Sequence, residues 1–504
     1  MSSTLPSNLP DPAPPPHRAA AVSEAVAAAA AAPVAASRLP AARRDREGRL
    51  AIDTRAILAL ALPLFLNSGI QAVLNLTDTW FIGRLSATAV AAVAAIHWMI
   101  LGLLLLLGGV AMGVQTTAAQ AYGAGRFHRA GRAVWSGVWA SLLSIPVFAG
   151  LAIAGPAALR SLGFDAEIVR LAAEFWMPRM GGGTLALLLW APLSFLYGTG
   201  QVRTAVMINL AVAAANILLN ELLIFRLGFG IAGSAWATNI AIAIGFVIAM
   251  AVLTRSRSQR RRYATHLLWR PQAAAIRWTI VFGLPIGVAI AFDLLGLAVF
   301  QLMMTRLGVI DAAATQIVMM LTSLSFMPAV GLGMAGTTLV GQSIGAGQPQ
   351  WAWRLGNRVT LVAIVHMGSV GLLLAAFAPW LAPLFVAAGD PLAPAVVATT
   401  IQLLWIAACY QLFDAVQLGC NFCLRGAGDT RYPAMMLLLL SWGLFLPLAH
   451  VLTFTRGTGP IAALPGFGLG SVGGWWASVV YILALAVAMS ARWRSRRWMS
   501  MRVA

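Results

Sequence analysis

Long apolar runs make up most of the sequence, and short polar segments separate them. Most of these runs are about 20 residues long, the length of helix that crosses a hydrocarbon core of about 30 Å. Backbone polar groups inside a bilayer must be satisfied within the protein, and these runs are too long and too uniformly apolar for barrel strands. The pattern therefore predicts twelve membrane-spanning helices, near residues 56–82, 88–118, 133–155, 168–196, 204–224, 231–253, 276–303, 312–340, 357–379, 394–422, 433–454 and 470–491.

The second half of the sequence repeats the first. Residues 120–125 (QAYGAG) recur as residues 342–347 (QSIGAG), a separation of 222 that also carries Leu62-Pro63 onto Leu284-Pro285. Farther along, matching glycines are separated by 228 and then by 240 residues. The twelve spans thus divide into six per repeat. In a membrane protein this duplication indicates a pseudo-symmetric transporter with its site between the two halves.

Composition excludes a soluble protein, because 60% of the residues are hydrophobic, 10% are charged and the mean hydropathy is +0.83. The net charge of +19 does not indicate a nucleic-acid partner. All 34 basic residues are arginines, and 27 of them fall in the segments that are cytoplasmic if the N-terminus is inside. This asymmetry follows the positive-inside rule. It predicts an inner-membrane protein with both termini in the cytoplasm.

The same pattern predicts the domain organisation. Residues 1–54 are rich in proline and alanine, and we expect a disordered cytoplasmic tail without a secretion signal. An N-terminal six-helix bundle is expected over residues 55–254 and a C-terminal one over residues 276–492. An Arg-rich cytoplasmic linker, 255–275, joins the bundles, and residues 493–504 form a basic cytoplasmic tail.

Three acidic residues lie inside predicted spans, where a charged side chain costs about 2.5–3.5 kcal/mol on insertion scales. They are Asp78 in the first span, Asp293 in the seventh and Asp414 in the tenth. Few basic residues lie within the spans, so local ion pairs do not neutralise all three. Carboxylates in this setting are typical of proton-binding or cation-binding sites; the alternative is a permanently protonated Asp that is hydrogen-bonded for packing.

Two amides in the fifth span, Asn216 and Asn220, are four residues apart and therefore share one helix face. Their side-chain carbonyls ligate a cation or hold Asp78, or else they bond neighbouring helices. Glu221 follows directly. It is either part of an unusual site or an interfacial residue in contact with water.

Further candidates are accessory to these. Gln411 precedes Asp414 by three residues, and Gln71 occupies the repeat position of Asp293. Pro63 and its repeat mate Pro285 lie inside the first span of each half, where proline removes a helical hydrogen bond. We expect these two prolines to act as hinges.

The sequence resembles the multidrug and toxic compound extrusion (MATE) family from about residue 55 to residue 492. The matching motifs are Leu62-Pro63 with Thr77-Asp78-Thr79, Gln120 with Gly123-Ala124-Gly125, Asn216 to Asn220, Leu284-Pro285 with Asp293, Gln342 with Gly345-Ala346-Gly347, and Gln411, Asp414 and Arg425-Gly426-Ala427-Gly428-Asp429-Thr430. The resemblance implies an all-α polytopic membrane protein. Its twelve helices would form two six-helix bundles related by a pseudo-twofold along the membrane normal, around a V-shaped cavity that opens alternately to either side.

The resemblance also implies two ion sites. In the NorM-like branch, an acid of the seventh helix and an aspartate of the tenth form the C-terminal site, which Asp293 and Asp414 match. An aspartate of the first helix and two asparagines of the fifth form the N-terminal site, which Asp78, Asn216 and Asn220 match. The DinF-like branch places a second acid in the fifth helix, where this chain has Asn220, so the NorM-like branch fits better. That branch often has Glu in the seventh helix, and Asp293 is shorter by one methylene.

The implied function is sodium- or proton-coupled antiport that exports amphipathic, cationic organic compounds by alternating access. We expect no cofactor besides the coupling ion, no enzyme activity, no nucleic-acid partner, and a monomer in the lipid bilayer. A lipid-linked precursor flippase is the alternative, but its cavity would be lined with several arginines. A membrane-embedded enzyme would need a cluster of catalytic groups, and the sequence contains no such cluster.

Overall fold

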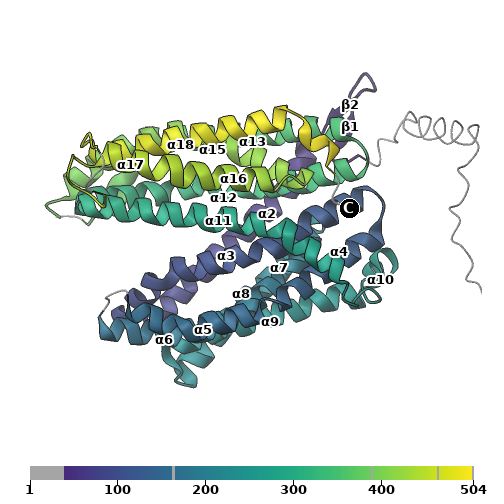
Figure 1. The fold of residues 1–504 in the computed structure, drawn as a ribbon, viewed down its shortest axis with the longest axis horizontal. Coiled ribbons are helices and arrows are strands. Elements are labelled where there is room, and N and C mark those ends of the chain that lie inside the picture. The colour runs from purple at the N-terminus through teal and green to yellow at the C-terminus, as the bar shows by residue number, and fades with distance from the viewer. Residues whose placement is uncertain (1–38, 162–164, 388–389, 462–464, 502–504) are drawn as a thin grey trace, which may run out of the picture.

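The computed structural model describes residues 39–161, 165–387, 390–461 and 465–501, and these residues are almost entirely helical (Figure 1). In the described ranges, eleven helical segments are long and apolar enough to cross a membrane. A bent pair of shorter helices would make a twelfth. The prediction of an all-α polytopic protein with about twelve spans is therefore confirmed.

The helices of the first half follow the expected spans closely. The third span is divided between two consecutive helices, and the fourth is bent by 44° at Gly182. Residues 181–183 are three consecutive glycines, which have a low helix propensity, so the break occurs there. The elements are α2 Thr54–Gly83, α3 Ala87–Gly123, α4 Phe127–Leu142, α5 Ile145–Arg160, α6 Ala166–Gly181, α7 Gly183–Gly198, α8 Val202–Asn220, the π-helix η2 Glu221–Arg226, α9 Gly230–Arg255 and the short α10 Arg257–Tyr263.

The second half contains a matching series. Its eleventh span is interrupted by one turn of π-helix, as the end of the fifth span is. The elements are α11 Ala273–Leu307, α12 Val309–Gly345, α13 Pro349–Ala376, α14 Ala378–Leu381, the 3-10 turn η3 Ala382–Phe385, α15 Ala393–Ala427, α16 Arg431–Leu440, the π-helix η4 Ser441–Phe445, α17 Leu446–Thr453, α18 Gly470–Arg494 and the 3-10 turn η5 Arg497–Ser500.

The two halves form two layers. Figure 1 shows the green and yellow helices of the second half above the blue and teal helices of the first. Helix α15 packs against α12, α13 and α18 within the second half, and α3 packs against α7 and α4 within the first. The layers meet where α3 lies along α11 and where α12 lies along α2 and α3.

Glycine allows the backbones of the two halves to touch. A Cβ atom on Gly109 of α3 would overlap the backbone of Gly287 in α11, and one on Gly331 of α12 would press on the backbone of Phe65 in α2. The repeat relates these two contacts. Position 109 plus 222 is position 331, and position 65 plus 222 is position 287. A small residue at the contact is what lets two helix backbones approach this closely.

A second pair of equivalent contacts lies at the C-terminal ends of α3 and α12. We call this end of the molecule the inner end, because α10 and the C-terminal segment lie there as well (Figure 1). A Cβ on Gly123 would overlap the carbonyl oxygen of Gln342, and a Cβ on Gly345 would overlap that of Gln120. The two glutamine amides also reach across to the other half. Gln120 Nε2 donates to the carbonyl of Gly426 (3.1 Å) and Gln342 Nε2 donates to that of Gly198 (3.0 Å).

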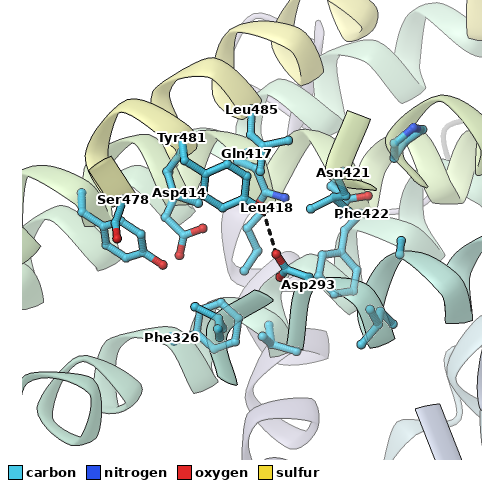
Figure 2. Close-up of a pocket in the computed structure, with 18 of the residues that line it drawn as sticks. Asp293, Phe326, Asp414, Gln417, Leu418, Asn421, Phe422, Ser478, Tyr481 and Leu485 are labelled. Carbon is cyan, nitrogen blue, oxygen red and sulfur yellow. Dashed lines mark hydrogen bonds between the residues drawn. The ribbon is translucent and has the colours of Figure 1, made fainter. Parts of the chain in front are cut away.

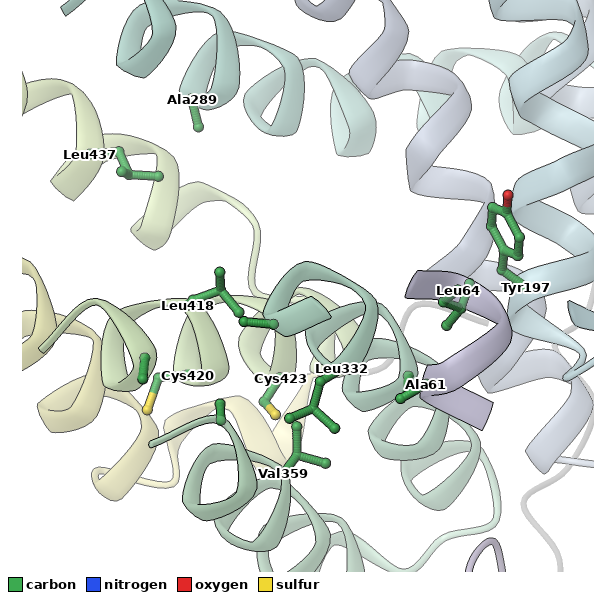
Figure 3. Packing of buried hydrophobic residues seen from close by; sticks show 14 of the residues in the cluster. Ala61, Leu64, Tyr197, Ala289, Leu332, Val359, Leu418, Cys420, Cys423 and Leu437 are labelled. Carbon is green, nitrogen blue, oxygen red and sulfur yellow. The ribbon is translucent and has the colours of Figure 1, made fainter. Parts of the chain in front are cut away.

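Buried apolar side chains connect the halves into one core. A single cluster includes Ala61 and Leu64 of α2, Tyr197 of α7 and Leu332 of α12, and it continues through Leu418 (Figure 3). The first and second halves are therefore held together by packing as well as by hydrogen bonds at the inner end.

The prediction of a disordered tail over residues 1–54 is wrong for the last part of that segment. Ala42–Arg44 (β1) and Leu50–Ile52 (β2) pair as a short antiparallel hairpin. The hairpin region is attached to the second half, since Trp351 Nε1 donates to the carbonyl of Pro40 (3.0 Å) and Arg358 Nε donates to Thr54 Oγ1 (3.0 Å). Residues 1–38 of the expected tail lie outside the described residues.

The linker is attached to the first half. Trp135 Nε1 of α4 donates to the carbonyl of Thr265 (2.7 Å), and Tyr263 of α10 is buried against Phe195. Burial raises the pKa of Tyr263 to about 12, so its hydroxyl stays neutral at physiological pH.

The expected basic tail, residues 493–504, begins inside α18 and is partly structured. Trp498 is fully buried and stacks on Trp493 with ring centroids 4.2 Å apart. Trp498 Nε1 also donates to the Trp493 carbonyl (2.8 Å). Residues 502–504 lie outside the described residues.

The close contact between α3 and α11 generates a test with a matched control. Gly109→Ala adds a Cβ that meets the Gly287 backbone, whereas Gly102→Ala adds one on the same face of α3 that meets nothing within 4 Å. Overpacking of this kind costs about 1–3 kcal/mol. We expect G109A to lower the apparent melting temperature of the purified protein in detergent and G102A to leave it unchanged. Equal melting temperatures for the two variants would contradict the contact.

Candidate functional site

The first half holds a polar cluster between α2, α8 and α9. Asn220 Nδ2 donates to Asp78 Oδ1 (2.6 Å) and to Asn216 Oδ1 (3.0 Å). Thr238 Oγ1 accepts from Asn216 Nδ2 (3.2 Å) and lies 3.4 Å from Asp78 Oδ2. The structure therefore brings together the three predicted residues of the first half, and it adds Thr238, which sequence reasoning missed.

This cluster retains acceptor capacity. Both asparagines are fully buried, and Asn220 Oδ1 has no hydrogen-bond partner among the described residues. A buried polar atom without a partner is costly and commonly marks a functional group. Together with the carboxylate of Asp78, this oxygen offers a small hard cation the ligand type it prefers. The same carboxylate is equally suited to carry a proton.

Arg179 is a half-buried arginine of the fourth span that sequence reasoning did not single out. It lies near the end of α6, where its Nη1 donates to Asn239 Oδ1 (3.0 Å), and it acts electrostatically on Asp78. No ion pair within 4 Å joins it to Asp78 among the described residues. Arg179 lies three residues before the bend at Gly182.

Glu221 follows Asn220 but does not join the cluster. It is exposed and begins the π-helix η2. This placement agrees with an interfacial residue in contact with water, one of the two alternatives that the sequence left open.

The second half holds a cavity of about 480 Å³ (Figure 2). All residues that line it lie between Ile286 and Leu485. Asp293 of α11 and Asp414 of α15 both face it, and Tyr481 of α18 donates from its hydroxyl to Asp293 Oδ1 (2.7 Å). The structure therefore brings the two predicted acids of the second half into one cavity. Tyr481 is a further site residue that the apolar pattern of the last span concealed.

Two oxygens of residues that line this cavity are buried without a partner among the described residues. They are Asp414 Oδ2 and Gln411 Oε1. Asp414 and Asp293 also interact electrostatically with each other. Two like charges beside unsatisfied acceptors in a poorly solvated site favour the arrival of a cation or a proton. The cavity is otherwise lined mainly by apolar side chains, such as Phe326 and Leu418.

A π-helical turn adjoins each site. Asn220 directly precedes η2, and Ser441 of η4 lies against the α11 segment that carries Asp293, so that a Cβ on Gly296 would press on Ser441 Oγ. Single π-turns inside α-helices occur frequently at functional sites. Neither turn could be read from the apolar pattern.

The remaining candidates lie outside the two sites. Gln71 is an exposed residue of α2. Pro63 and Pro285 lie inside α2 and α11, which continue through them. Both prolines are next to the close contacts between the halves at Phe65 and Gly287. Their role as hinges stays a prediction.

Comparisons with known proteins agree on one family. The family model for MatE matches residues 63–222 and again residues 285–451, so the two matches begin 222 residues apart. A probable multidrug resistance protein NorM of Mesorhizobium japonicum is 30% identical over 483 residues, which cover 91% of this chain and 97% of that protein. The protein of the same name from Burkholderia pseudomallei is 30% identical over 481 residues, with 92% and 96% covered.

Solved structures show the same fold. A MATE protein crystallised in the straight conformation superposes with a TM-score of 0.73 at 19% identity, covering 87% of this chain and 95% of that one. A multidrug resistance MATE family transporter in an outward-facing conformation gives a TM-score of 0.72 at 20% identity, with the same coverage.

A double-mutant cycle tests the bond between Asp78 and Asn220. Hydrogen bonds to charged groups contribute about 1.5–3 kcal/mol, and neutral ones about 0.5–1.5 kcal/mol. We therefore expect the unfolding free energies of D78A, N220A and the double variant, measured in mixed micelles, to give a coupling in the higher range. The comparison is the cycle of N67A and N209A, which removes a neutral bond between the same two helices. A coupling near zero for the first cycle would exclude the bond.

Proposed function

The chain belongs to the MATE family, and we propose that it exports amphipathic organic cations in exchange for sodium ions or protons. Its relatives carry the names of multidrug resistance transporters of the NorM type, so the chain is a multi-pass membrane transporter and not an enzyme. The cation coupling, the class of substrate and the steps below are our proposal. We also propose that it is a monomer in the inner membrane with both termini in the cytoplasm, as the arginine distribution favours.

The observation that carries the proposal is the composition of the second-half cavity. Its wall is mainly apolar, and it holds Asp293 and Asp414 with an unpartnered carboxylate oxygen. An apolar pocket with a few placed charges is the usual form of a site for an organic molecule. The positive group of an amphipathic cation would lie beside the two carboxylates, and its apolar part would contact the surrounding side chains.

The same carboxylates explain the exchange. A coupling ion and a cationic substrate would compete for Asp293 and Asp414, so each displaces the other. A bound species shifts a conformational equilibrium only by the difference in its affinity for the two states. We propose that ion binding releases the substrate and favours the state in which the inner end is open, and that substrate bound from the inside favours the state in which Gln120 and Gln342 close this end.

The first-half cluster would serve as a second ion site. Asp78 has fixed amide and hydroxyl partners, and it faces a different set of helices from the cavity. An ion bound there would stabilise the packing of α2 on α8 and α9. Because α2 also packs on α12 across the halves, this site would influence the same equilibrium.

The flippase alternative is less consistent with the cavity. A cavity for a pyrophosphate-linked lipid would present several arginines. Among the described residues that line this one, Arg425 is the only arginine, against three aspartates. One of these, Asp429, is paired with Arg492 (2.6 Å).

Transport assays in proteoliposomes test the proposal. We expect D78N, D293N and D414N each to reduce export of a fluorescent organic cation driven by an imposed sodium or pH gradient, by about 10-fold or more. The reason is that each removes a charged ligand worth about 1.5–3 kcal/mol. Asp390 is exposed in a loop, so D390N should transport like the unmodified protein. Full ion-dependent export by all three site variants would overturn the proposal.

A growth assay separates export from lipid flipping. Expression in an efflux-deficient bacterial host should protect the host against amphipathic cations, and D414N should remove the protection. Loss of viability or envelope defects on deletion of the gene, without any change in drug susceptibility, would favour the flippase.

A further inference from the structure

The linker between the two halves lies along α4. Trp135 Nε1 and Trp139 Nε1 of α4 donate to the carbonyls of Thr265 and Trp269, respectively (both 2.7 Å). The two tryptophans are four residues apart and share one helix face, and the two carbonyls are four residues apart in the same order. Because α4 begins at the inner end, this part of the linker follows the helix away from that end and toward the bilayer.

The end of the linker therefore reaches membrane depth. Trp269 is held by Trp139, which is twelve residues from the start of α4 at Phe127, a rise of about 18 Å along the helix axis. Position 139 also lies inside the third apolar run, 133–155, which the sequence predicts to be in the bilayer. Trp269 is nevertheless 51% exposed and Leu267 is 67% exposed. Exposed tryptophan at this level is typical of the boundary between hydrocarbon and lipid headgroups.

Two arginines adjoin this exposed apolar segment. Arg270 directly follows Trp269, and Arg277 lies near the start of α11, next to Trp278. The Trp278 ring stacks on that of Phe282 with centroids 4.8 Å apart. Both arginines are exposed, and neither side chain forms an ion pair or a hydrogen bond with another residue that the structure describes. Both guanidinium groups are therefore available to a ligand.

The neighbouring elements contain no acidic residue that would neutralise these charges. Residues 126–164, which include α4, contain no Asp or Glu, and neither do residues 222–292, which include α9, α10, the linker and the first part of α11. Asp429, on the loop before α16, is buried and already paired with Arg492 (2.6 Å). An uncompensated positive surface of this kind attracts anions. Because it lies at membrane depth, the anions closest to it are the phosphates of lipid headgroups.

We propose that Arg270 and Arg277 bind the phosphate headgroup of an anionic phospholipid in the leaflet at the inner end, and that Leu267 and Trp269 contact its acyl chains. A guanidinium group matches a phosphate because it donates two N–H groups to two oxygens at once. The exposed leucine and tryptophan favour a lipid over a free anion, which has no apolar part to place there. None of these residues lines the second-half cavity, so the inference does not depend on the proposed cation exchange.

A purely topological role for the two arginines predicts something different. If they only orient the chain during insertion, the folded protein has no preference for headgroup charge at this place. Helix α10 supplies the comparison, because Arg257 and Arg261 are also exposed and lie on the face opposite the buried Gln259. The Tyr263 ring at the end of α10 contacts that of Phe127 (centroids 5.9 Å apart), so α10 lies at the start of α4 and not at the depth of the linker's end.

Native mass spectrometry of the full chain in detergent measures lipid affinity directly. The protein is titrated with phosphatidylglycerol and with phosphatidylcholine, whose headgroup contains the same phosphate but has no net charge. Each arginine near an anionic surface contributes about fivefold in affinity. We therefore expect the double variant R270Q/R277Q to bind phosphatidylglycerol about 10-fold or more weakly and phosphatidylcholine with less than about twofold change. The control R257Q/R261Q removes the same charge from α10 and should bind both lipids as the unmodified chain does.

Three results would overturn the lipid site and leave the export proposal intact. They are equal weakening by the two double variants, unchanged binding in R270Q/R277Q, and no preference of the unmodified protein for phosphatidylglycerol. Glycerol phosphate, which lacks acyl chains, should not displace the bound lipid; displacement would assign the site to a soluble anion instead. If the double variant does not fold, R270Q alone must still lower the affinity for phosphatidylglycerol about fivefold.

Discussion

The structure depends on the backbone contact between its two halves. Gly109 and Gly287 allow the backbones of α3 and α11 to touch, Gly331 does the same for α12 on α2, and the repeat relates the two contacts. Gln120 and Gln342 then close the inner end with two equivalent hydrogen bonds to backbone carbonyls. At the inner end the halves meet through backbone atoms and these amides, so this contact can separate with less repacking than the apolar core that also joins the halves. Reversible closure of this kind is what alternating access requires.

The chemistry does not share the symmetry of these contacts. The first half surrounds Asp78 with amide and hydroxyl donors in a packed cluster, whereas the second half places Asp293 and Asp414 on an open cavity with unpartnered oxygens. The repeat positions of Asp78 and Asp293 are Phe300 and Gln71, neither of which is charged. A duplicated scaffold thus carries one tightly coordinated site and one site with room for an organic molecule.

The sequence alone predicted the spans, the two halves and the intramembrane acids, because each of these follows from which residues occur where along the chain. Apolar runs located the spans, the 222-residue repeat located the two halves, and the cost of a charge in the membrane singled out Asp78, Asp293 and Asp414. The sequence did not predict the side-chain contacts that depend on how helices rotate and tilt against one another. Tyr481 lies 188 residues from Asp293 on an apolar helix, and Arg179 donates to Asn239, which lies 60 residues away. The hairpin at residues 42–52 was missed because its partner surface is on α13 of the other half.

Distances between spin labels test the closure of the inner end most directly. Cys409, Cys420 and Cys423 would first be replaced, and label pairs introduced at Ala124 and Ala346 on the inner end, or at Leu85 and Val309 at the opposite ends of α2 and α12. In nanodiscs, we expect sodium or acidic pH to lengthen the inner distance and shorten the outer one, and an amphipathic cation to reverse both changes. Distances that stay constant, or that change in the same direction at both ends, would contradict exchange through alternate opening of the two ends.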